Sequence, residues 1–281
     1  SKNPLIVNSP AKINLGLKIL NKMESGYHNL DTIFCEIEFG DELEFIESDE
    51  LEFSAEGIDV PTDNSNLIVK AYKLLAAKKS YEKPHYKIHL SKKIPIGAGL
   101  GGGSSNAGVT IKTLNYLWDL NLSIKEMQSI SSSLGADVAF FINGKIQHAT
   151  GIGDILNSID SSFLKNKKAL LVCPNFSIST TWAYKNINKF LNVQKNTLKF
   201  APFEKPVNWL LFENDFEKVV KSAYPETGEI IKSLKKADAI YAGLSGSGST
   251  VFGIYDQQYD LNCIRNSFPD TYRTFETCFN L

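Results

Sequence analysis

The chain has 281 residues and a formal net charge of −1, so its overall field favours neither nucleic acid nor an acidic membrane. Its length allows two domains with a large core, and no run approaches the roughly 18 apolar residues of a membrane span. The four cysteines lack the spacing of a zinc site, and we expect a cytoplasmic protein with reduced cysteines and no obligate protein partner.

Residues 5–20 form the first predicted strand, and their pattern alternates from Lys12 onward. Apolar side chains at positions 13, 15, 17 and 19 face one side, so Lys12 and Asn14 point together on the other. Lysine is common on the wet face of an edge strand, and that plain interpretation stands beside a functional one.

A polar turn then leads into Gly26, Tyr27 and His28. A single histidine is usually a surface residue or one satisfied by its neighbours, and a tyrosine beside it can simply pack. An aromatic ring and an imidazole where a loop meets a strand can also stack on a base and hydrogen-bond to it. Both interpretations remain open on the residues alone.

Short apolar runs of strand character follow, and we expect turns between them at Gly40–Asp41 and Ser48–Asp49. Asn66 precedes a helical pattern over residues 67–75, which predicts that its side chain caps a helix. The sequence therefore changes from strands to a helix at this point.

The most informative segment runs from Pro95 to Asn106. Five of the seven residues from Gly97 to Gly103 are glycines, which removes side chains where a ligand must approach the backbone. Two serines follow, and apolar residues at 107, 111, 114 and 118 then recur at helical spacing. Because a helix N-terminus offers N–H groups to an anion, we interpret the segment as a phosphate-binding loop. The alternative is a glycine-rich turn without a ligand, although glycine loses much conformational freedom on ordering.

The letters of this loop do not by themselves identify its ligand. There is no lysine for a Walker loop, whereas Gly97, Gly99 and Gly102 satisfy the weak Gly-x-Gly-x-x-Gly pattern of dinucleotide-binding folds. That alternative would make the protein a nicotinamide-dependent dehydrogenase. Residues 86–95 alternate polar and apolar, unlike the buried strand such a fold needs, and Asp119 lies at the end of the following helix.

Beyond this helix, Ser123 and Glu126 form the pattern of a capping box, and the helix they start should stop at Gly135. Asp137 stands directly before an apolar run, where it could cap a helix, carry a functional carboxylate, or do both. We place a domain boundary near residue 150, which divides the chain into an N-terminal domain, 1–150, and a C-terminal domain, 151–281.

The C-terminal half has hydroxyl and aromatic residues before another helical pattern. We expect Thr180 or Thr181 to cap that helix, with Tyr184 close to its start. Residues 188–208 are polar and broken by prolines, which indicates a variable surface loop. A further helix is predicted at 225–236. The strand, glycine loop and strand that follow it are either a plain hairpin or part of a site.

Three spaced segments resemble the motifs of one family, the GHMP kinases, named for galactokinase, homoserine, mevalonate and phosphomevalonate kinases. Pro95–Ala107 is similar to their ATP-binding motif, Pro10–Asn14 to the first motif and residues 239–252 to the third. The details look most like the members that phosphorylate CDP-methylerythritol, a small molecule of the non-mevalonate route to isoprenoids. The resemblance implies an α/β fold, the two-lobed α+β architecture of these kinases. Its N-terminal lobe would be like domain 2 of ribosomal protein S5, and its C-terminal lobe ferredoxin-like.

The resemblance also implies roles for individual residues. Lys12 and Asp137 would be catalytic, with Asp137 as the base that accepts the hydroxyl proton; Ala139 replaces the usual proline nearby. ATP would be bound by Asn66, Pro95, Ile96, Gly97, Ala98, Gly99, Leu100, Gly101, Gly102, Gly103, Ser104 and Ser105. The substrate would be held by Asn14, Tyr27, His28, Thr180 and Tyr184. Mg²⁺ is expected with ATP, and its protein ligands stay open, with Ser105 and Asp137 as candidates.

Two other functions stay open at this point. A different GHMP kinase would keep the loop and lose selectivity for cytidine. A regulatory protein would bind ATP without turnover, and the presence of both Lys12 and Asp137 argues against it through the resemblance.

Overall fold

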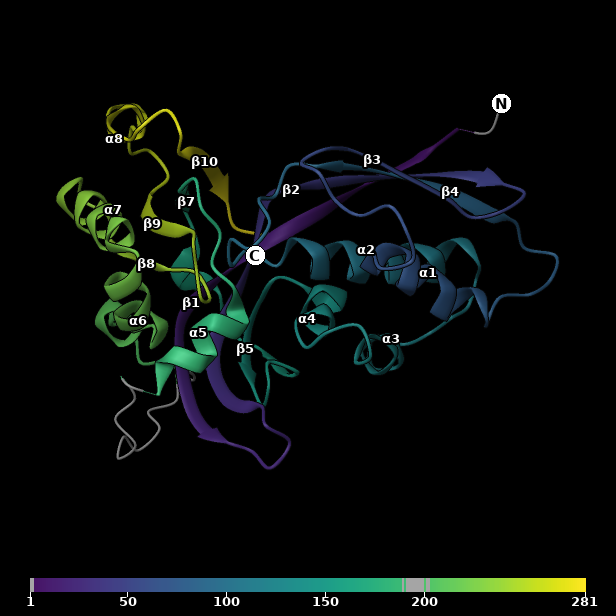
Figure 1. The fold of residues 1–281 in the computed structure, drawn as a ribbon, viewed down its shortest axis with the longest axis horizontal. Coiled ribbons are helices and arrows are strands. Elements are labelled where there is room, and N and C mark those ends of the chain that lie inside the picture. Colours follow the sequence, from purple (N-terminus) through teal and green to yellow (C-terminus); the bar gives the residue numbers. More distant parts are fainter. Residues whose placement is uncertain (1–2, 189, 191–199, 201–202) are drawn as a thin grey trace. The chain divides into compact units, whose positions relative to one another are not determined.

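The computed structural model describes residues 3–188, 190, 200 and 203–281, which form the predicted mixture of helices and strands (Figure 1). They fall into two compact units, each built from several stretches of the chain. Unit 1 comprises Ser1–Ala11, Gly40–Pro95 and Gly101–Gly144, and unit 2 comprises Lys12–Phe39, Ile96–Leu100 and Lys145–Leu281. The predicted loop of residues 188–208 lies largely outside the described residues.

Unit 1 is a sheet with helices packed against it. The strand order is β3-β4-β2, where β3 is Glu52–Gly57, β4 is His85–Lys92 and β2 is His28–Ser48. β3 runs parallel to β4, whereas β4 pairs antiparallel with the second half of β2. The helices are α1 (Leu67–Ala76), α2 (Gly102–Leu117), α3 (Ile124–Ser131) and α4 (Val138–Asn143). In Figure 1, α1 and α2 lie along one face of β3 and β4.

The core of unit 1 confirms the helical patterns in the sequence. Ala107, Ile111, Leu114 and Trp118 are buried and pack in one cluster with residues of α1, β2 and β4. The predicted caps at the starts of α1 and α3 are also present. α3 ends at Ser131, before the predicted stop, because the hydroxyls of three consecutive serines bond back to carbonyls within the helix and compete with its continuation.

Gly40 and Asp41 do not form the predicted turn, and they continue β2 instead. The glycine is needed for a close approach, since a Cβ on Gly40 would lie 2.4 Å from the carbonyl oxygen of Ser9. Asp41 is buried rather than exposed at a bend. A Gly-Asp pair is a turn signal in isolation, and here the packing of a neighbouring strand overrides it. The turn after Ser48 is confirmed, because β2 ends there.

The strand β1 (Leu5–Lys22) begins in unit 1, and its residues from Lys12 onward belong to unit 2. Unit 2 also contains two groups of strands. The first half of β2 pairs antiparallel with β5 (Ile146–Thr150), which pairs with β6 (Ile155–Ser158). A separate antiparallel sheet has the order β10-β7-β9-β8. Its strands are β7 (Lys167–Cys173), β8 (Tyr241–Leu244), β9 (Val251–Asp256) and β10 (Arg273–Cys278).

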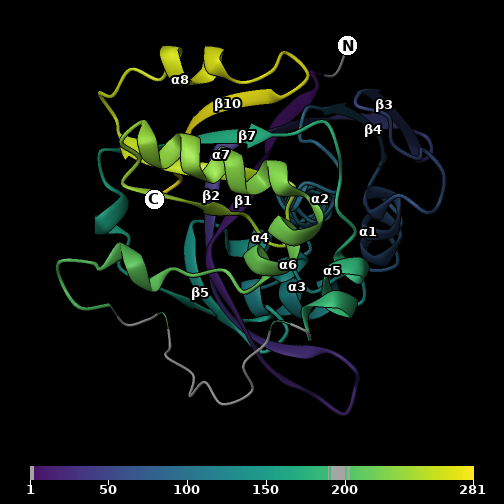
Figure 2. The same cartoon turned by 60° about the vertical axis from the view of Figure 1, so that its left-hand side comes forward.

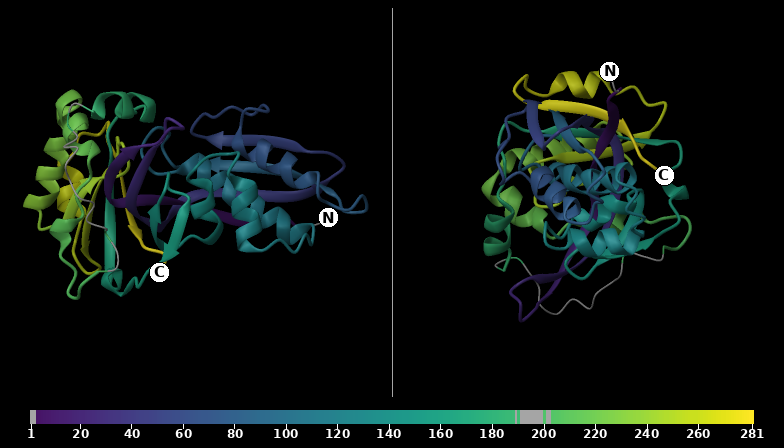
Figure 3. Two further views of the ribbon diagram at one scale, coloured as in Figure 1. Left: turned by 90° about the horizontal axis from the view of Figure 1, so that it is seen from below. Right: turned by 90° about the vertical axis from the view of Figure 1, so that its right-hand side faces the viewer.

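Helices α6 (Phe216–Ala223) and α7 (Pro225–Lys236) lie along one face of the four-stranded sheet, as Figure 2 and Figure 3 show from different sides. The predicted helix at 225–236 is α7 (Pro225–Lys236), and its expected inward residues Ile230, Ile231 and Leu234 are buried. The other helices are α5 (Thr180–Ile187), α6 (Phe216–Ala223) and α8 (Asn262–Ser267), with 3₁₀ turns at Ser162–Leu164 and Trp209–Leu211. None of the described helices combines the length and apolar character needed to cross a membrane.

Candidate active site

The middle of the glycine loop, residues 96–100, is fixed within unit 2 by its carbonyl groups. Each carbonyl from Gly97 to Leu100 accepts a hydrogen bond. The donors, at 2.7 to 3.1 Å, are the N–H groups of Ile178, Thr250 and Lys12 and the side chains of Lys12 and Ser245. Because the C=O and N–H of a trans peptide point in opposite directions, the N–H groups of residues 98–101 point away from these donors. These N–H groups are therefore not directed at the groups that fix the loop.

Gly99 occupies a position where no side chain fits. Its φ is +76°, and a Cβ there would lie 2.1 Å from the carbonyl oxygen of Ser245 and 3.2 Å from that of Gly248. Residues 245–248 lie in the connection between β8 and β9, so the segment that resembles the third motif packs on the glycine loop. The hairpin alternative also describes part of its role, since β8 and β9 are antiparallel neighbours.

Lys12 and Asn14 point to the same side of β1, as the alternation predicts, but that side is buried rather than wet. The Lys12 ammonium donates to the side-chain oxygen of Asn14 and to the carbonyl oxygen of Gly99, the latter at 3.1 Å. It also lies 5.3 Å from the centre of the Phe34 ring, within range of a cation–π interaction. The Asn14 amide donates to the Thr32 hydroxyl at 3.0 Å. The ammonium is thus held in one orientation at the glycine loop.

The start of α2, in unit 1, provides the second part of the loop. Gly101 precedes the helix with φ +67°, and no side chain caps the first turn among the described residues. The first N–H groups of α2 therefore lack intrahelical acceptors and are suited to a phosphate. Ser104 is half-buried at this end, whereas Ser105 is fully buried and its hydroxyl lies 2.9 Å from that of Ser9. Ser104 is consequently better placed than Ser105 to contact a ligand with its side chain.

Asp137 stands at the N-cap position of α4, but its side chain makes no capping hydrogen bond. Its backbone is helical, with φ −80° and ψ −13°, and the residue is half-buried. A capping aspartate normally has extended backbone and accepts from the first turn, so the capping interpretation fails here. The carboxylate is therefore not committed to the helix. Asp137 belongs to unit 1 and Lys12 to unit 2, and their pairing stays a prediction.

Two of the predicted substrate residues meet in unit 2. The rings of His28, at the start of β2, and Tyr184, in α5, are stacked with centres 5.2 Å apart and planes 18° from parallel. Burial lowers the pKa of His28 below its ordinary value of 6.5, and the charge of Lys22 lowers it further. His28 is therefore neutral at pH 7 and can use one ring nitrogen as donor and the other as acceptor.

Tyr27 and Thr180, also in unit 2, are both exposed. The Tyr27 side chain is 63% exposed, which leaves its ring open to stacking. The Thr180 hydroxyl lies 3.4 Å from that of Ser247, in the third motif. The cap of α5 is Ser179, whose hydroxyl accepts from Trp182 N, so the prediction of Thr180 or Thr181 as the cap was wrong by one or two residues. The Thr180 hydroxyl is thereby not used to cap the helix.

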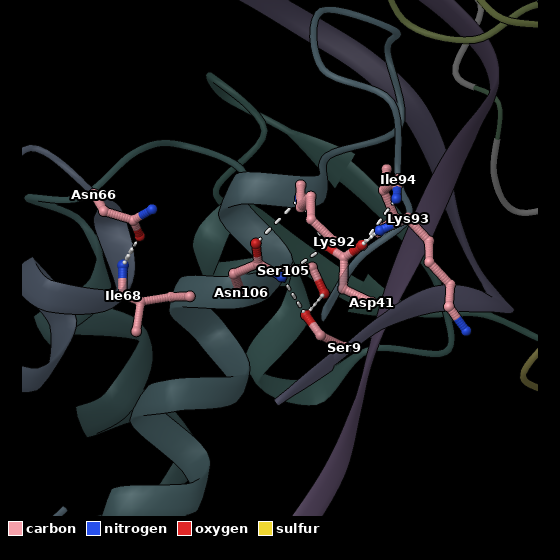
Figure 4. Close-up of polar contacts among 9 residues, drawn as sticks. All are labelled: Ser9, Asp41, Asn66, Ile68, Lys92, Lys93, Ile94, Ser105 and Asn106. Carbon is pink, nitrogen blue, oxygen red and sulfur yellow. Dashed lines mark hydrogen bonds and ion pairs between the residues drawn. The ribbon is translucent and has the colours of Figure 1, made fainter. Parts of the chain in front are cut away.

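Asn66 performs the predicted capping role in unit 1. Its side-chain oxygen accepts from Ile68 N at 2.9 Å (Figure 4), and its amide nitrogen donates to the carbonyl oxygen of Pro61 at 2.8 Å. Both ends of the amide are therefore used to fix the start of α1. A contact of Asn66 with adenine stays a prediction.

Sequence analysis missed two buried hydroxyl groups that organise this region. Ser245 donates to Gly99 O at 2.7 Å and accepts from Asn14 N at 3.2 Å. Thr32 accepts from Asn14 and donates to the carbonyl oxygen of Gly16 at 2.6 Å. A serine at the end of an apolar run beside glycines was a usable signal for Ser245, whereas nothing local distinguished Thr32 from any other strand threonine.

Family models match two segments of the chain: GHMP kinases N terminal domain at residues 66–145 and GHMP kinases C terminal at residues 197–274. The chain is 38% identical over 277 residues to the 4-diphosphocytidyl-2-C-methyl-D-erythritol kinase of Pelodictyon phaeoclathratiforme, covering 96% of each chain. It is 43% identical over 254 residues to the protein of that name from Azobacteroides pseudotrichonymphae, covering 89% of this chain and 92% of the relative.

Solved structures show the same architecture. A crystal structure of 4-(cytidine 5'-diphospho)-2C-methyl-D-erythritol kinase superposes with a TM-score of 0.82 at 25% identity, covering 99% of this chain and 100% of the other. The mevalonate kinase of Methanococcus jannaschii superposes with a TM-score of 0.67 at 19% identity, covering 99% of both chains, a likeness of fold alone.

Proposed function

The chain belongs to the GHMP kinases, and from that premise we propose that it transfers the γ-phosphoryl group of ATP to the 2-hydroxyl of 4-diphosphocytidyl-2-C-methyl-D-erythritol. The products are the 2-phosphate and ADP, and the reaction belongs to the non-mevalonate route to isoprenoid precursors. The fold is the two-lobed α+β fold of these kinases. One observation carries the proposal: the Lys12 ammonium is held against the carbonyl of Gly99, inside the glycine loop.

ATP binds through backbone groups in this proposal. The chain has only two arginines, Arg265 and Arg273, so bidentate arginine clamps on phosphate are scarce. The N–H groups of residues 98–101 and of the first turn of α2 supply the donors instead, aided by the helix dipole. Binding of this kind holds the γ-phosphoryl group in place, and positioning accounts for most of the catalysis in phosphoryl transfer.

Asp137 is the proposed base and Lys12 the proposed electrostatic partner. The O–H bond of the acceptor breaks as its proton passes to the Asp137 carboxylate, and the oxygen forms a bond to the γ-phosphorus. The bond between that phosphorus and the β–γ bridging oxygen breaks, and ADP leaves. Lys12 orients the hydroxyl and offsets the negative charge that gathers there. The unused capping position of Asp137 supports its role, since the carboxylate need not leave another partner.

The cytidine group is proposed to bind near the His28–Tyr184 stack, with Tyr27, Thr180 and Asn14 as further contacts. Neutral His28 can donate to or accept from the edge of a cytosine, which carries both kinds of group. Tyr184 also packs edge-on against Phe216, with ring centres 5.1 Å apart, so its orientation is fixed before any ligand arrives. The exposed Tyr27 ring offers an additional stacking face.

Mg²⁺ would neutralise the ATP phosphates when it is bound. The described residues contain no group of three or more histidines, cysteines and carboxylates that could hold a metal alone. This fits an ion carried mainly by the phosphates with one or two protein ligands. Asp137 suits that role better than Ser105, whose hydroxyl is already bonded to Ser9. A carboxylate has two oxygens, so ligand and base are compatible roles.

We also place the boundary between the two domains near residue 150, and the gap between the family-model matches supports this division. The compact units divide the chain differently, since unit 2 also includes residues 12–39 and 96–100. A cytoplasmic location is proposed because all four cysteines are free, and two of them are buried.

A coupled ADP-release assay tests the proposed function. The purified chain is given ATP, Mg²⁺ and one acceptor at a time: 4-diphosphocytidyl-2-C-methyl-D-erythritol, mevalonate, homoserine or galactose. We expect turnover with the first and background rates with the other three. Turnover with mevalonate or homoserine, and none with the cytidine compound, would replace this proposal with another GHMP kinase activity.

A further inference from the structure

A buried carboxylate in unit 1 collects four hydrogen bonds at the base of the glycine loop. One oxygen of Asp41 accepts from Lys93 N at 2.7 Å and from Ile94 N at 2.8 Å. The other accepts from the Lys92 ammonium at 2.7 Å and from the Asn106 amide at 3.0 Å (Figure 4). Asp41 is 1% exposed and Lys92 is 5% exposed, so the pair is shielded from water and ions.

The same network reaches the start of α2. The Lys92 ammonium donates to the side-chain oxygen of Asn106 at 3.1 Å, and the Asn106 amide donates to the Ser9 hydroxyl at 2.8 Å. Ser9 in turn lies 2.9 Å from the hydroxyl of Ser105. A Cβ on Gly102 would lie 2.8 Å from the Lys92 nitrogen, so Gly102, the first residue of α2, packs closely against this ammonium.

These contacts hold both ends of one loop. Residues 92–94 lead into the loop and residues 102–106 follow it, and Asp41 of β2 is bonded to both stretches. Only residues 95–101 lie between the fixed ends. A short loop with many glycines has much conformational freedom to lose when it binds a ligand, and fixing its ends beforehand reduces that loss.

We propose that Asp41 and Lys92 are positioning residues, whose buried ion pair holds the two ends of the glycine loop in the arrangement that binds the ATP phosphates. This inference rests on the proposed binding of ATP by that loop. The side chains act through the backbone they fix, because the carboxylate has four donors and the ammonium is almost fully covered.

The direction in which ADP affinity changes distinguishes a positioning role of Asp41 from a direct effect of its charge. Asp41→Asn removes a negative charge near the proposed phosphate site, so a purely electrostatic effect would tighten the binding of ADP. If the variant displaces the ends of the glycine loop, the binding of ADP becomes weaker instead. Lys92→Met weakens binding under either account. In the double variant Asp41→Asn/Lys92→Met the net charge of the pair is zero, as in the wild type, and the asparagine can still accept from the backbone N–H groups.

The experiment measures the dissociation constant of ADP for the full-length protein by isothermal titration calorimetry, well below the melting temperature of each variant. We expect each single variant to bind ADP about tenfold more weakly, and the double variant to regain most of that loss. The KM for ATP should rise in parallel, while the KM for the acceptor changes less than about twofold. A purely structural role would lower the melting temperature and leave both constants of the folded protein unchanged.

Matched variants keep the test interpretable. Lys87→Met removes a lysine from the same strand, whose 3.7 Å ion pair with Glu52 is exposed, and it should bind ADP like the wild type. If the single variants do not fold, Ser9→Ala breaks only the outer link to Ser105 and Asn106 and should weaken ADP binding about threefold.

Three results would overturn the inference. Unchanged or tighter ADP binding in folded Asp41→Asn, or in Ser9→Ala where Asp41→Asn does not fold, would do so. A double variant as weak as Lys92→Met would also do so, because removing both charges together would then not restore the arrangement of the loop ends. A wild-type chain that binds no adenine nucleotide would overturn the proposed function as well, which distinguishes that failure from the first two.

Discussion

Asp41 and Asp137 are two aspartates of the same unit in opposite surroundings. Asp41 is buried in the middle of β2 and accepts four hydrogen bonds, which use all the lone-pair directions of a carboxylate. Asp137 is half-buried before α4 and makes no capping bond. Asp41 therefore has no lone pair left to accept a substrate proton, whereas Asp137 has one. The number of fixed donors, rather than the residue type, therefore separates the structural carboxylate from the candidate base.

The largest expected effect is on stability, at Asp41. Asp41→Asn leaves the Lys92 ammonium buried without its counter-charge, and breaking a buried pair in this way costs about 3–5 kcal/mol of unfolding free energy. Urea denaturation measures the loss. Asp137→Asn should change the same quantity by less than about 0.5 kcal/mol, because its half-buried carboxylate makes no capping hydrogen bond to α4. Equal losses in the two variants would remove the contrast between the two carboxylates.

The next effect is on turnover, at Asp137. Asp137→Asn cannot accept the hydroxyl proton, and we expect kcat to fall at least about 10²-fold with little change in ATP affinity. Steady-state kinetics with the cytidine acceptor and ADP titration of the same preparation measure both. Near-normal kcat in this variant would exclude Asp137 as the base.

A smaller effect is expected at the glycine loop, which lies between Asp41 and Asp137 in the sequence. In Gly99→Ala the new Cβ would lie 2.1 Å from a backbone oxygen at a φ of +76°, so the loop must shift. We expect the KM for ATP to rise about tenfold or more. Gly228→Ala in α7 is the matched control, since its nearest neighbour would be a lysine side-chain carbon at 3.4 Å. An unchanged KM for ATP in Gly99→Ala would show that this part of the loop does not contact the nucleotide.

The smallest effect is a pH dependence at His28, whose side chain is half-buried. Its pKa is lowered by burial and by Lys22, so the neutral form persists below pH 6.5 and protonation is opposed in the folded protein. Any stability tied to the neutral ring is present above 6.5 and is lost as the pH falls through the lowered pKa. The KM for the cytidine acceptor should stay flat from pH 8 to below 6.5 and rise only as the pH falls through the lowered pKa of His28. A profile of the same shape in His28→Gln would assign the change to another group.

The sequence was sufficient for features whose signals are local. The glycine loop, the helix after it and the caps at Asn66 and Ser123 each depend on residues within a few positions of one another. Glycines that lead into a helical pattern can be recognised without knowing what lies beside them. His28 was a stacking candidate from the residues around it, whereas Tyr184 was one only through the family resemblance, and their contact with each other was not predictable.

Features that depend on distant partners could not be predicted. Asp41 and Lys92 are 51 positions apart, and in isolation Gly40–Asp41 has the composition of a turn. The face of β1 that carries Lys12 and Asn14 has the alternation of a wet face, and only the packing of residues 96–100 and 245 within unit 2 buries it. The missing capping bond of Asp137 depends on its helical backbone angles, which an aspartate before an apolar run does not suggest.

The most direct test of the central claim follows phosphorus during the reaction. The wild-type chain is mixed with ATP, Mg²⁺ and 4-diphosphocytidyl-2-C-methyl-D-erythritol, and the mixture is examined by ³¹P NMR. The account predicts one new phosphomonoester signal that grows in step with ADP, while the diphosphate signals of the acceptor persist. Release of ADP with free inorganic phosphate and no new ester, or no loss of ATP at all, would contradict it.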